Sequence, residues 1–101
     1  MHLTQLLLPL QDNAGRAYED NLFKSINKIL IERFGGVTAF SRVPAKGIWL
    51  HADRKKQDDV IVVEVMSENL DRDWWRSFRE RLEAEMDQTE IVVRTHPIDR
   101  L

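Results

Sequence analysis

Three residues within two apolar segments carry groups that could do chemistry together. Glu64 interrupts the run VIVVEVM (60–66), and Arg94 and His96 lie two residues apart in EIVVRTHP (90–97). A carboxylate, a guanidinium and an imidazole could bind an anion or transfer a proton. Whether they act together depends on which face of the folded chain each side chain occupies.

Alternation along the strands places these groups on one face of a sheet. Ile61, Val63 and Val65 form a wholly apolar set that we expect beneath helices, which leaves Glu64 on the opposite face. We expect segment 3–10 to lie between the other two strands, so that Glu64 and Arg94 can meet only across Gln5. With Arg42 and Trp49 from the segment VTAFSRVPAKGIWL, the candidate ligand-binding residues are Gln5, Arg42, Trp49, Glu64, Arg94 and His96.

A structural role competes with this chemistry. Glu64 could be a half-buried glutamate that a salt bridge satisfies at a subunit contact. The sequence favours that interpretation, because none of these residues has a spacing that only chemistry would demand. The catalytic residues therefore stay unknown at this stage.

Composition narrows the possible partners. The chain has 101 residues, 43% of them hydrophobic and 32% charged, which is typical of a folded domain. Its net charge of −2 does not favour nucleic acid or an acidic membrane, and its lack of cysteine excludes disulfides and thiolate sites. No segment approaches the roughly 20 apolar residues of a membrane span. We expect a cytoplasmic protein that binds neither nucleic acid nor membrane.

The order of elements predicts the fold. Strands are expected near 3–10, 37–44, 60–66 and 90–97, and amphipathic helices over 16–34 and from the region of Asn69 or Asp71 to Gln88. The order βαββαβ predicts an α+β, ferredoxin-like domain over residues 1–101, with a four-stranded antiparallel sheet and two helices on one face. The nearly all-apolar segments 3–10 and 60–66 are then the central strands, and the other two are the edges.

The stretch RFGGVTAFSRVPAKGIWL (33–50) mixes the glycines of a loop with the residues of a strand. Gly35-Gly36 follows a predicted helix, where carbonyls are free, whereas a phosphate-binding glycine loop precedes a helix. We therefore interpret the pair as a helix stop at which one glycine has positive φ. Ala45–Gly47 is expected to be a turn, and the charged or amide run from Asp53 to Asp59 an exposed turn.

Several specific functions lack their motifs. His2, His51 and His96 lie on different predicted elements, so neither a metal site nor a cofactor is expected. An RNA-binding domain of this topology needs aromatic residues on the central strands, which have none. An acylphosphatase needs an arginine loop and an asparagine on the second strand; DNAGR offers only Arg16, and VTAFSRVP has no asparagine.

The face of the sheet opposite the helices predicts self-association. It would expose Leu3, Leu7, Val62, Met66 and Val92, and an apolar patch of this kind marks an interface or a ligand cleft. We expect a two-fold homodimer formed through this face.

The whole chain resembles small stand-alone ferredoxin-like bacterial proteins of the dimeric α+β barrel type. The resemblance rests on the element order, the RFGGVT junction, the G-x-W of Gly47 and Trp49, and the Q-x-E-I-V-V run from Gln88. It implies a homodimer and, in some members, monooxygenase, isomerase or haem-degrading activity. Two functions stay open: a homodimeric domain that binds a small ligand at the sheet face, and a cofactor-free enzyme that acts on a small organic molecule through His96, Arg94 and Glu64.

Overall fold

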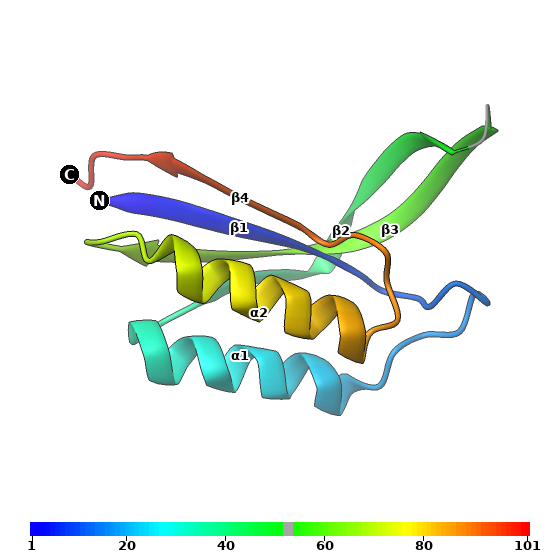
Figure 1. The fold of residues 1–101 in the computed structure, drawn as a ribbon, viewed down its shortest axis with the longest axis horizontal. Coiled ribbons are helices and arrows are strands. Elements are labelled where there is room, and N and C mark those ends of the chain that lie inside the picture. Colours follow the sequence, from blue (N-terminus) through cyan, green and yellow to red (C-terminus); the bar gives the residue numbers. More distant parts are fainter. Residues whose placement is uncertain (52–53) are drawn as a thin grey trace.

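A computed structural model defines the backbone of residues 1–51 and 54–101 and the side chains of 1–38 and 60–101. The chain is an α+β fold in which two helices cover one face of an antiparallel sheet (Figure 1). Its elements are β1 (His2–Pro9), α1 (Asp20–Phe34), β2 (Thr38–His51), β3 (Arg54–Ser67), α2 (Arg72–Glu85) and β4 (Val92–Pro97).

The strands lie in the order β2-β3-β1-β4. β1 pairs antiparallel with β3 on one side and with β4 on the other, so that Leu6 lies opposite both Val63 and Val93. The apolar segments 3–10 and 60–66 are therefore adjacent at the centre, as predicted, and both of their backbone edges are hydrogen-bonded.

The expectation of a regular four-stranded sheet needs correction. Only β3, β1 and β4 form an uninterrupted three-stranded antiparallel sheet. β2 joins it over Thr38–Phe40, and the register then shifts, since Phe40 pairs with Val62 but Ala45 pairs with Val60. Residues 41–44 of β2 therefore lie opposite a single residue of β3, Ile61. Pro44 has no N–H to donate to the ladder, and an irregularity of this kind bends the strand.

Beyond the irregularity β2 and β3 form a long two-stranded hairpin. Ala45–His51 pairs with Arg54–Val60, and this part projects away from the helices (Figure 1). The predicted turn at Ala45–Gly47 is wrong, and so is the predicted exposed turn over 53–59, because 54–59 belong to β3.

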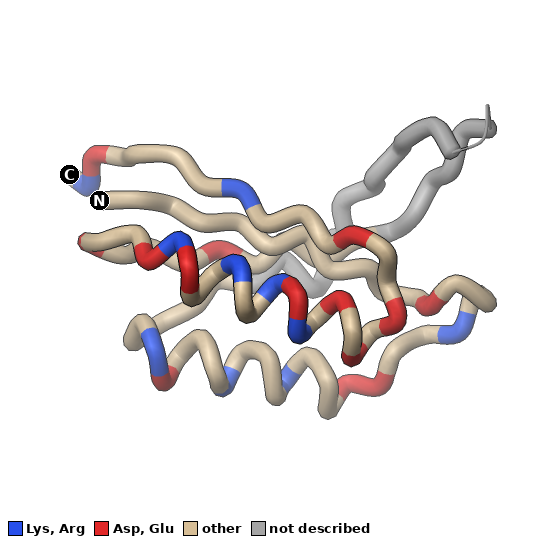
Figure 2. Tube along the Cα trace, viewed as in Figure 1, with Lys and Arg blue, Asp and Glu red and all other residues tan. Residues whose placement is uncertain are grey.

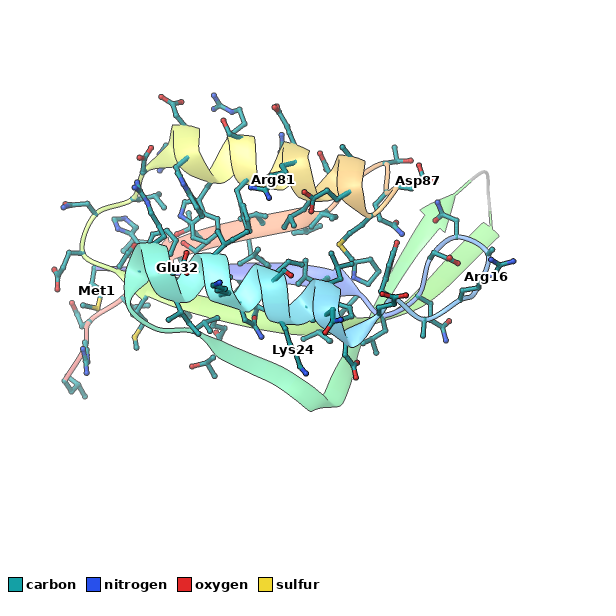
Figure 3. The ribbon with its side chains drawn as sticks, turned by 90° about the horizontal axis from the view of Figure 1, so that it is seen from below. Met1, Arg16, Lys24, Glu32, Arg81 and Asp87 are labelled. Carbon is teal, nitrogen blue, oxygen red and sulfur yellow. The ribbon has the colours of Figure 1, made fainter. Side chains whose placement is uncertain are left out.

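The core lies between the sheet and the two helices. The strands contribute alternate residues, and Ile61, Val63 and Val65 are buried as predicted. Seen from below in Figure 3, both helices lie in front of the sheet. The buried apolar side chains that form this core are Leu6, Leu8, Ile26, Leu30, Ile61, Val63, Val65, Trp75, Phe78, Leu82, Met86 and Ile91.

Local signals determine the ends of the helices. α2 begins after Asp71, whose carboxylate accepts a hydrogen bond of 3.1 Å from the backbone N–H of Trp74. α1 ends at Gly35, which has φ of 83° and donates its N–H to the carbonyl of Ile31. Gly35 therefore stops the helix as predicted, and Gly36 does not need a left-handed conformation.

Replacing Gly35 with valine should destabilise the protein by about 1 kcal/mol or more, because a β-branched residue is strained at positive φ. Urea denaturation measures the change. Gly36→Val is the matched control, since a Cβ at Gly36 meets no atom within 4 Å. Equal stability of the two variants would contradict the helix-stop role of Gly35.

Candidate functional site

The open face is the side of the sheet that the helices do not cover. Its side chains come from β1, β3 and β4 and are only partly buried or exposed: Leu3, Gln5, Leu7, Val62, Glu64, Met66, Val92 and Arg94. β1 carries no charged residue along its length (Figure 2). The open face is thus mostly apolar, with three polar side chains in its middle.

These polar side chains form a hydrogen-bonded row across three strands. Gln5 lies opposite Glu64 on β3 and Arg94 on β4. Its Nε2 donates to Glu64 Oε2 at 2.9 Å, and its Oε1 accepts from Arg94 Nε at 2.8 Å. The glutamine amide suits this position because it donates on one side and accepts on the other. The sequence-based expectation that Glu64 and Arg94 meet across Gln5 is therefore met.

The other three candidate residues do not join this row in the described structure. His96 is exposed on β4, opposite Leu3. Arg42 and Trp49 lie in β2, and their side chains are outside the described residues. Ligand binding by any of the six residues stays a prediction.

A groove adjoins the row at the C-terminal end of β3. It has a volume of about 1010 Å³, and Glu64, Leu3 and Met66 contribute to it from the open face. The junction between α1 and β2 forms another wall, from Arg33 to Thr38. β2 reaches β3 only from the Thr38–Glu64 pair onward, so the last residues of β3 have no β2 partner beside them. The groove occupies this unpaired edge.

The groove contains polar groups that sequence patterns did not identify. The hydroxyl of Ser67 lines it, is buried, and has no hydrogen-bond partner among the described residues. Arg33 and Asp71 also line it and form an ion pair at 3.1 Å between α1 and the start of α2. A serine at the end of a strand forms no recognisable sequence motif. Ser67 lines the groove because β2 begins to pair only at Thr38, which leaves the end of β3 without a neighbouring strand.

The three residues considered for catalysis do not converge on one cavity. Glu64 lines the groove, Arg94 lines a smaller cleft between α2 and β4, and His96 lines neither. Among the side chains of residues 1–38 and 60–101, no three histidine, aspartate or glutamate residues cluster closely enough to hold a metal ion. In the same residues, no helix has the length and apolar character needed to cross a membrane.

Comparisons with known proteins identify the fold. No protein-family model and no curated protein matches the chain. Among solved structures, a phage SAM lyase in complex with S-methyl-5′-thioadenosine aligns with a TM-score of 0.66 at 10% identity, over 94% of this chain and 79% of the lyase. The divalent cation tolerance protein CutA1 from Thermus thermophilus aligns with a TM-score of 0.65 at 16% identity, over 99% of this chain and 86% of its own.

A mutant of CutA1 from Pyrococcus horikoshii is also similar, with a TM-score of 0.62 and 11% identity over 100% of this chain and 86% of CutA1. These structures share a small ferredoxin-like α+β fold with the chain. Identities this low establish the fold alone.

Replacing Gln5 with methionine should lower the free energy of unfolding by about 1 kcal/mol, because both side-chain hydrogen bonds of the row are lost while the shape is retained. Denaturation in urea provides the measurement. Glu64→Gln is the control, since its amide oxygen can still accept from Gln5, and we expect it to retain most of the stability. An unchanged stability of Gln5→Met would show that the row does not stabilise the isolated fold.

Proposed function

We propose that this protein is a homodimeric domain that binds a small organic ligand at the open face and its adjoining groove. The observation that carries the proposal is the Glu64–Gln5–Arg94 row, which crosses an otherwise apolar face and ends at a groove of about 1010 Å³. Ligand sites commonly combine an apolar lining with a few oriented polar groups.

Self-association is supported by the apolar surface of the open face. Met66 is 47% exposed and Val92 is 42% exposed. Contiguous apolar surface on a sheet usually lies at an interface, because each Å² removed from water contributes roughly 25 cal/mol before the costs of association. A second copy of the chain fits this surface, since a two-fold axis would bring apolar side chains of one open face onto those of the other.

The projecting hairpin also favours an assembly. Ala45–His51 and Arg54–Val60 form two strands that extend beyond the helix-covered sheet. A two-stranded hairpin is marginally stable when it stands alone in water. Contact with a partner chain would supply the stabilisation that the helices do not supply there.

The chemistry of the groove favours a ligand with an apolar body and a cationic or hydrogen-bond-donating group. Leu3 and Met66 provide apolar surface beside the carboxylate of Glu64. One oxygen of Glu64 accepts from Gln5, and the other accepts no hydrogen bond from the described residues, so a ligand could donate to it. The hydroxyl of Ser67, which has no partner among the described residues, adds a second polar contact.

The solved structures are compatible with this role. The similar phage SAM lyase was determined with S-methyl-5′-thioadenosine, so a related small ferredoxin-like fold can accommodate a small molecule. That complex supports the class of function and does not identify a ligand for this chain.

The alternative, a cofactor-free enzyme, has weaker support. It requires Glu64, Arg94 and His96 to face one reaction space, and in the single chain they line different surfaces. Only a dimer that brought one chain's His96 to the partner's Glu64 would supply that space. The binding function needs no such rearrangement.

The substitution Val92→Asp should convert the dimer to a monomer, because it places an unpaired charge in the buried contact. Sedimentation velocity at high micromolar concentration reports the mass. Ile31→Asp is the matched control: Ile31 is 48% exposed, like Val92 at 42%, but it lies on α1, outside the open face. A monomeric wild type would refute the dimer, and a folded dimer of Val92→Asp would refute its formation through the open face.

Ligand binding can be tested with 2-phenylethylamine and its neutral counterpart 2-phenylethanol. We expect the amine to shift the methyl resonance of Met66 and to bind about tenfold more weakly to Glu64→Gln, because a charge-assisted hydrogen bond contributes roughly 1.5–3 kcal/mol. NMR titration gives both affinities. If the amine and the alcohol bind equally, or if Glu64→Gln binds the amine as the wild type does, Glu64 does not select the ligand.

A further inference from the structure

A second cavity lies on the opposite side of the sheet from the open face. This cleft separates α2 from β4 and has a volume of about 240 Å³. It does not include Gln5, Glu64 or the other groove residues, so it is independent of the function proposed above. Arg94 borders it through β4, but the guanidinium of Arg94 is hydrogen-bonded to Gln5.

Three arginines line one wall of this cleft. Arg72, Arg76 and Arg79 come from α2 at positions i, i+4 and i+7, a spacing that places them on a single stripe of the helix. Figure 2 shows that basic and acidic residues alternate along α2, so the stripe is a local concentration of positive charge on a mixed helix. Guanidinium groups present several N–H donors in a plane and bind oxyanions through paired hydrogen bonds.

The first of these arginines lies where the helix disfavours it. Arg72 is the first residue of α2, and the N-terminal end of a helix carries partial positive charge. Arg72 forms no ion pair with the side chains that the structure describes. A bound anion would reverse this unfavourable interaction, because it would meet both the guanidinium and the positive end of the helix.

The existing ion pairs of the other two arginines are weak. Arg76 lies 3.4 Å from Asp73, whose side chain is 91% exposed. Arg79 lies 3.9 Å from both Glu80 and Glu83. The pairs with Asp73 and Glu80 are long and solvated and contribute little free energy, so the guanidiniums can turn to a better acceptor. Glu83 is less exposed, at 19%, but its pair with Arg79 is also long.

Further hydrogen-bond donors line the cleft, both from β1 and β4 and from α2 itself. Thr4 is buried and donates its hydroxyl to that of Thr95 at 3.2 Å, which leaves the proton of Thr95 free to donate. Trp75 lines the cleft and is 5% exposed, and its indole N–H has no hydrogen-bond partner among the described residues. The Nε of Arg79 is likewise buried and, within the same part of the chain, has no hydrogen-bond partner, since Glu83 Oε1 lies 3.9 Å from it. Buried donors without acceptors are costly, and an oxyanion would satisfy them.

We propose that this cleft binds the phosphate group of a small metabolite. Sites that enclose a whole organic ligand have volumes of about 300–1,000 Å³. The cleft is smaller, at about 240 Å³, so it suits the anionic group while the rest of the molecule extends into solvent. Arg72, Arg76 and Arg79 contact the phosphate oxygens together with Trp75 of the same helix, and Thr95 donates from β4 on the opposite wall. Among the described side chains, no acidic one lines the cleft, and the carboxylates of Asp73, Glu80 and Glu83 lie 3.4–3.9 Å from the guanidiniums of Arg76 and Arg79.

Titration with inorganic phosphate at constant ionic strength tests the proposal. Two-dimensional NMR spectra of the isotope-labelled protein should show saturable shifts of the Trp75 indole N–H and of the Thr4 and Thr95 amides. Trp75→Phe assigns the indole resonance. The affinity should fall about tenfold in Arg79→Gln, because charge-assisted hydrogen bonds are roughly twice as strong as neutral ones. Arg72→Gln changes an exposed residue and serves as a second variant if Arg79→Gln does not fold.

The control is Arg81→Gln on the same helix. Arg81 pairs with Glu85 at 2.9 Å and does not line the cleft, so this variant should bind phosphate as the wild type does. Equal losses in Arg79→Gln and Arg81→Gln would show only general charge screening and would overturn the site. Shifts of the same size with sodium chloride would also overturn it. Acetate binding as tight as phosphate binding would overturn the assignment of phosphate.

Discussion

The packing of β1 and β3 against the two helices is the interaction on which the rest of the molecule depends. Leu6 and Leu8 of β1 and Val63 and Val65 of β3 are at most 2% exposed in this contact. Side chains alternate between the faces of a strand, so burying one set sends its neighbours to the other side. Gln5 lies on the open face because Thr4 and Leu6 face the helices.

This constraint explains how a polar row can exist on an apolar face. β1 is central, and the pairing of both of its edges sets Gln5 beside β3 and β4 at once. A slip of one residue in either register would turn Gln5 toward the core and break the contacts with Glu64 and Arg94. The backbone pairing of the strands therefore positions the three side chains of the row. The hydrogen bonds between those side chains then stabilise an arrangement that the backbone has already set.

β4 is the element that serves both sides of the sheet. Arg94 extends over the open face, and its neighbour Thr95 meets Thr4 on the helix side. As an edge strand, β4 pairs only with β1, which leaves room for a cleft between its free edge and α2. The open face suits an apolar ligand or a second chain, whereas the cleft is lined by positive charge. The two surfaces therefore favour different chemistry.

Sequence patterns determined the parts of the structure that depend on neighbouring residues. The apolar run 60–66 identified a central strand and its buried set, and the pair Gly35-Gly36 and the alternatives Asn69 or Asp71 marked helix ends that the structure places at Gly35 and Asp71. Tertiary structure alone decided the course of β2, since residues 54–59, which are charged apart from Gln57, resemble a loop in sequence yet pair with β2 in a hairpin beyond the core. Tertiary structure also determined which residues surround Ser67 and Arg79, because both clusters bring together residues that are distant in the chain. The residue types of one segment do not specify which other segment will pack beside it.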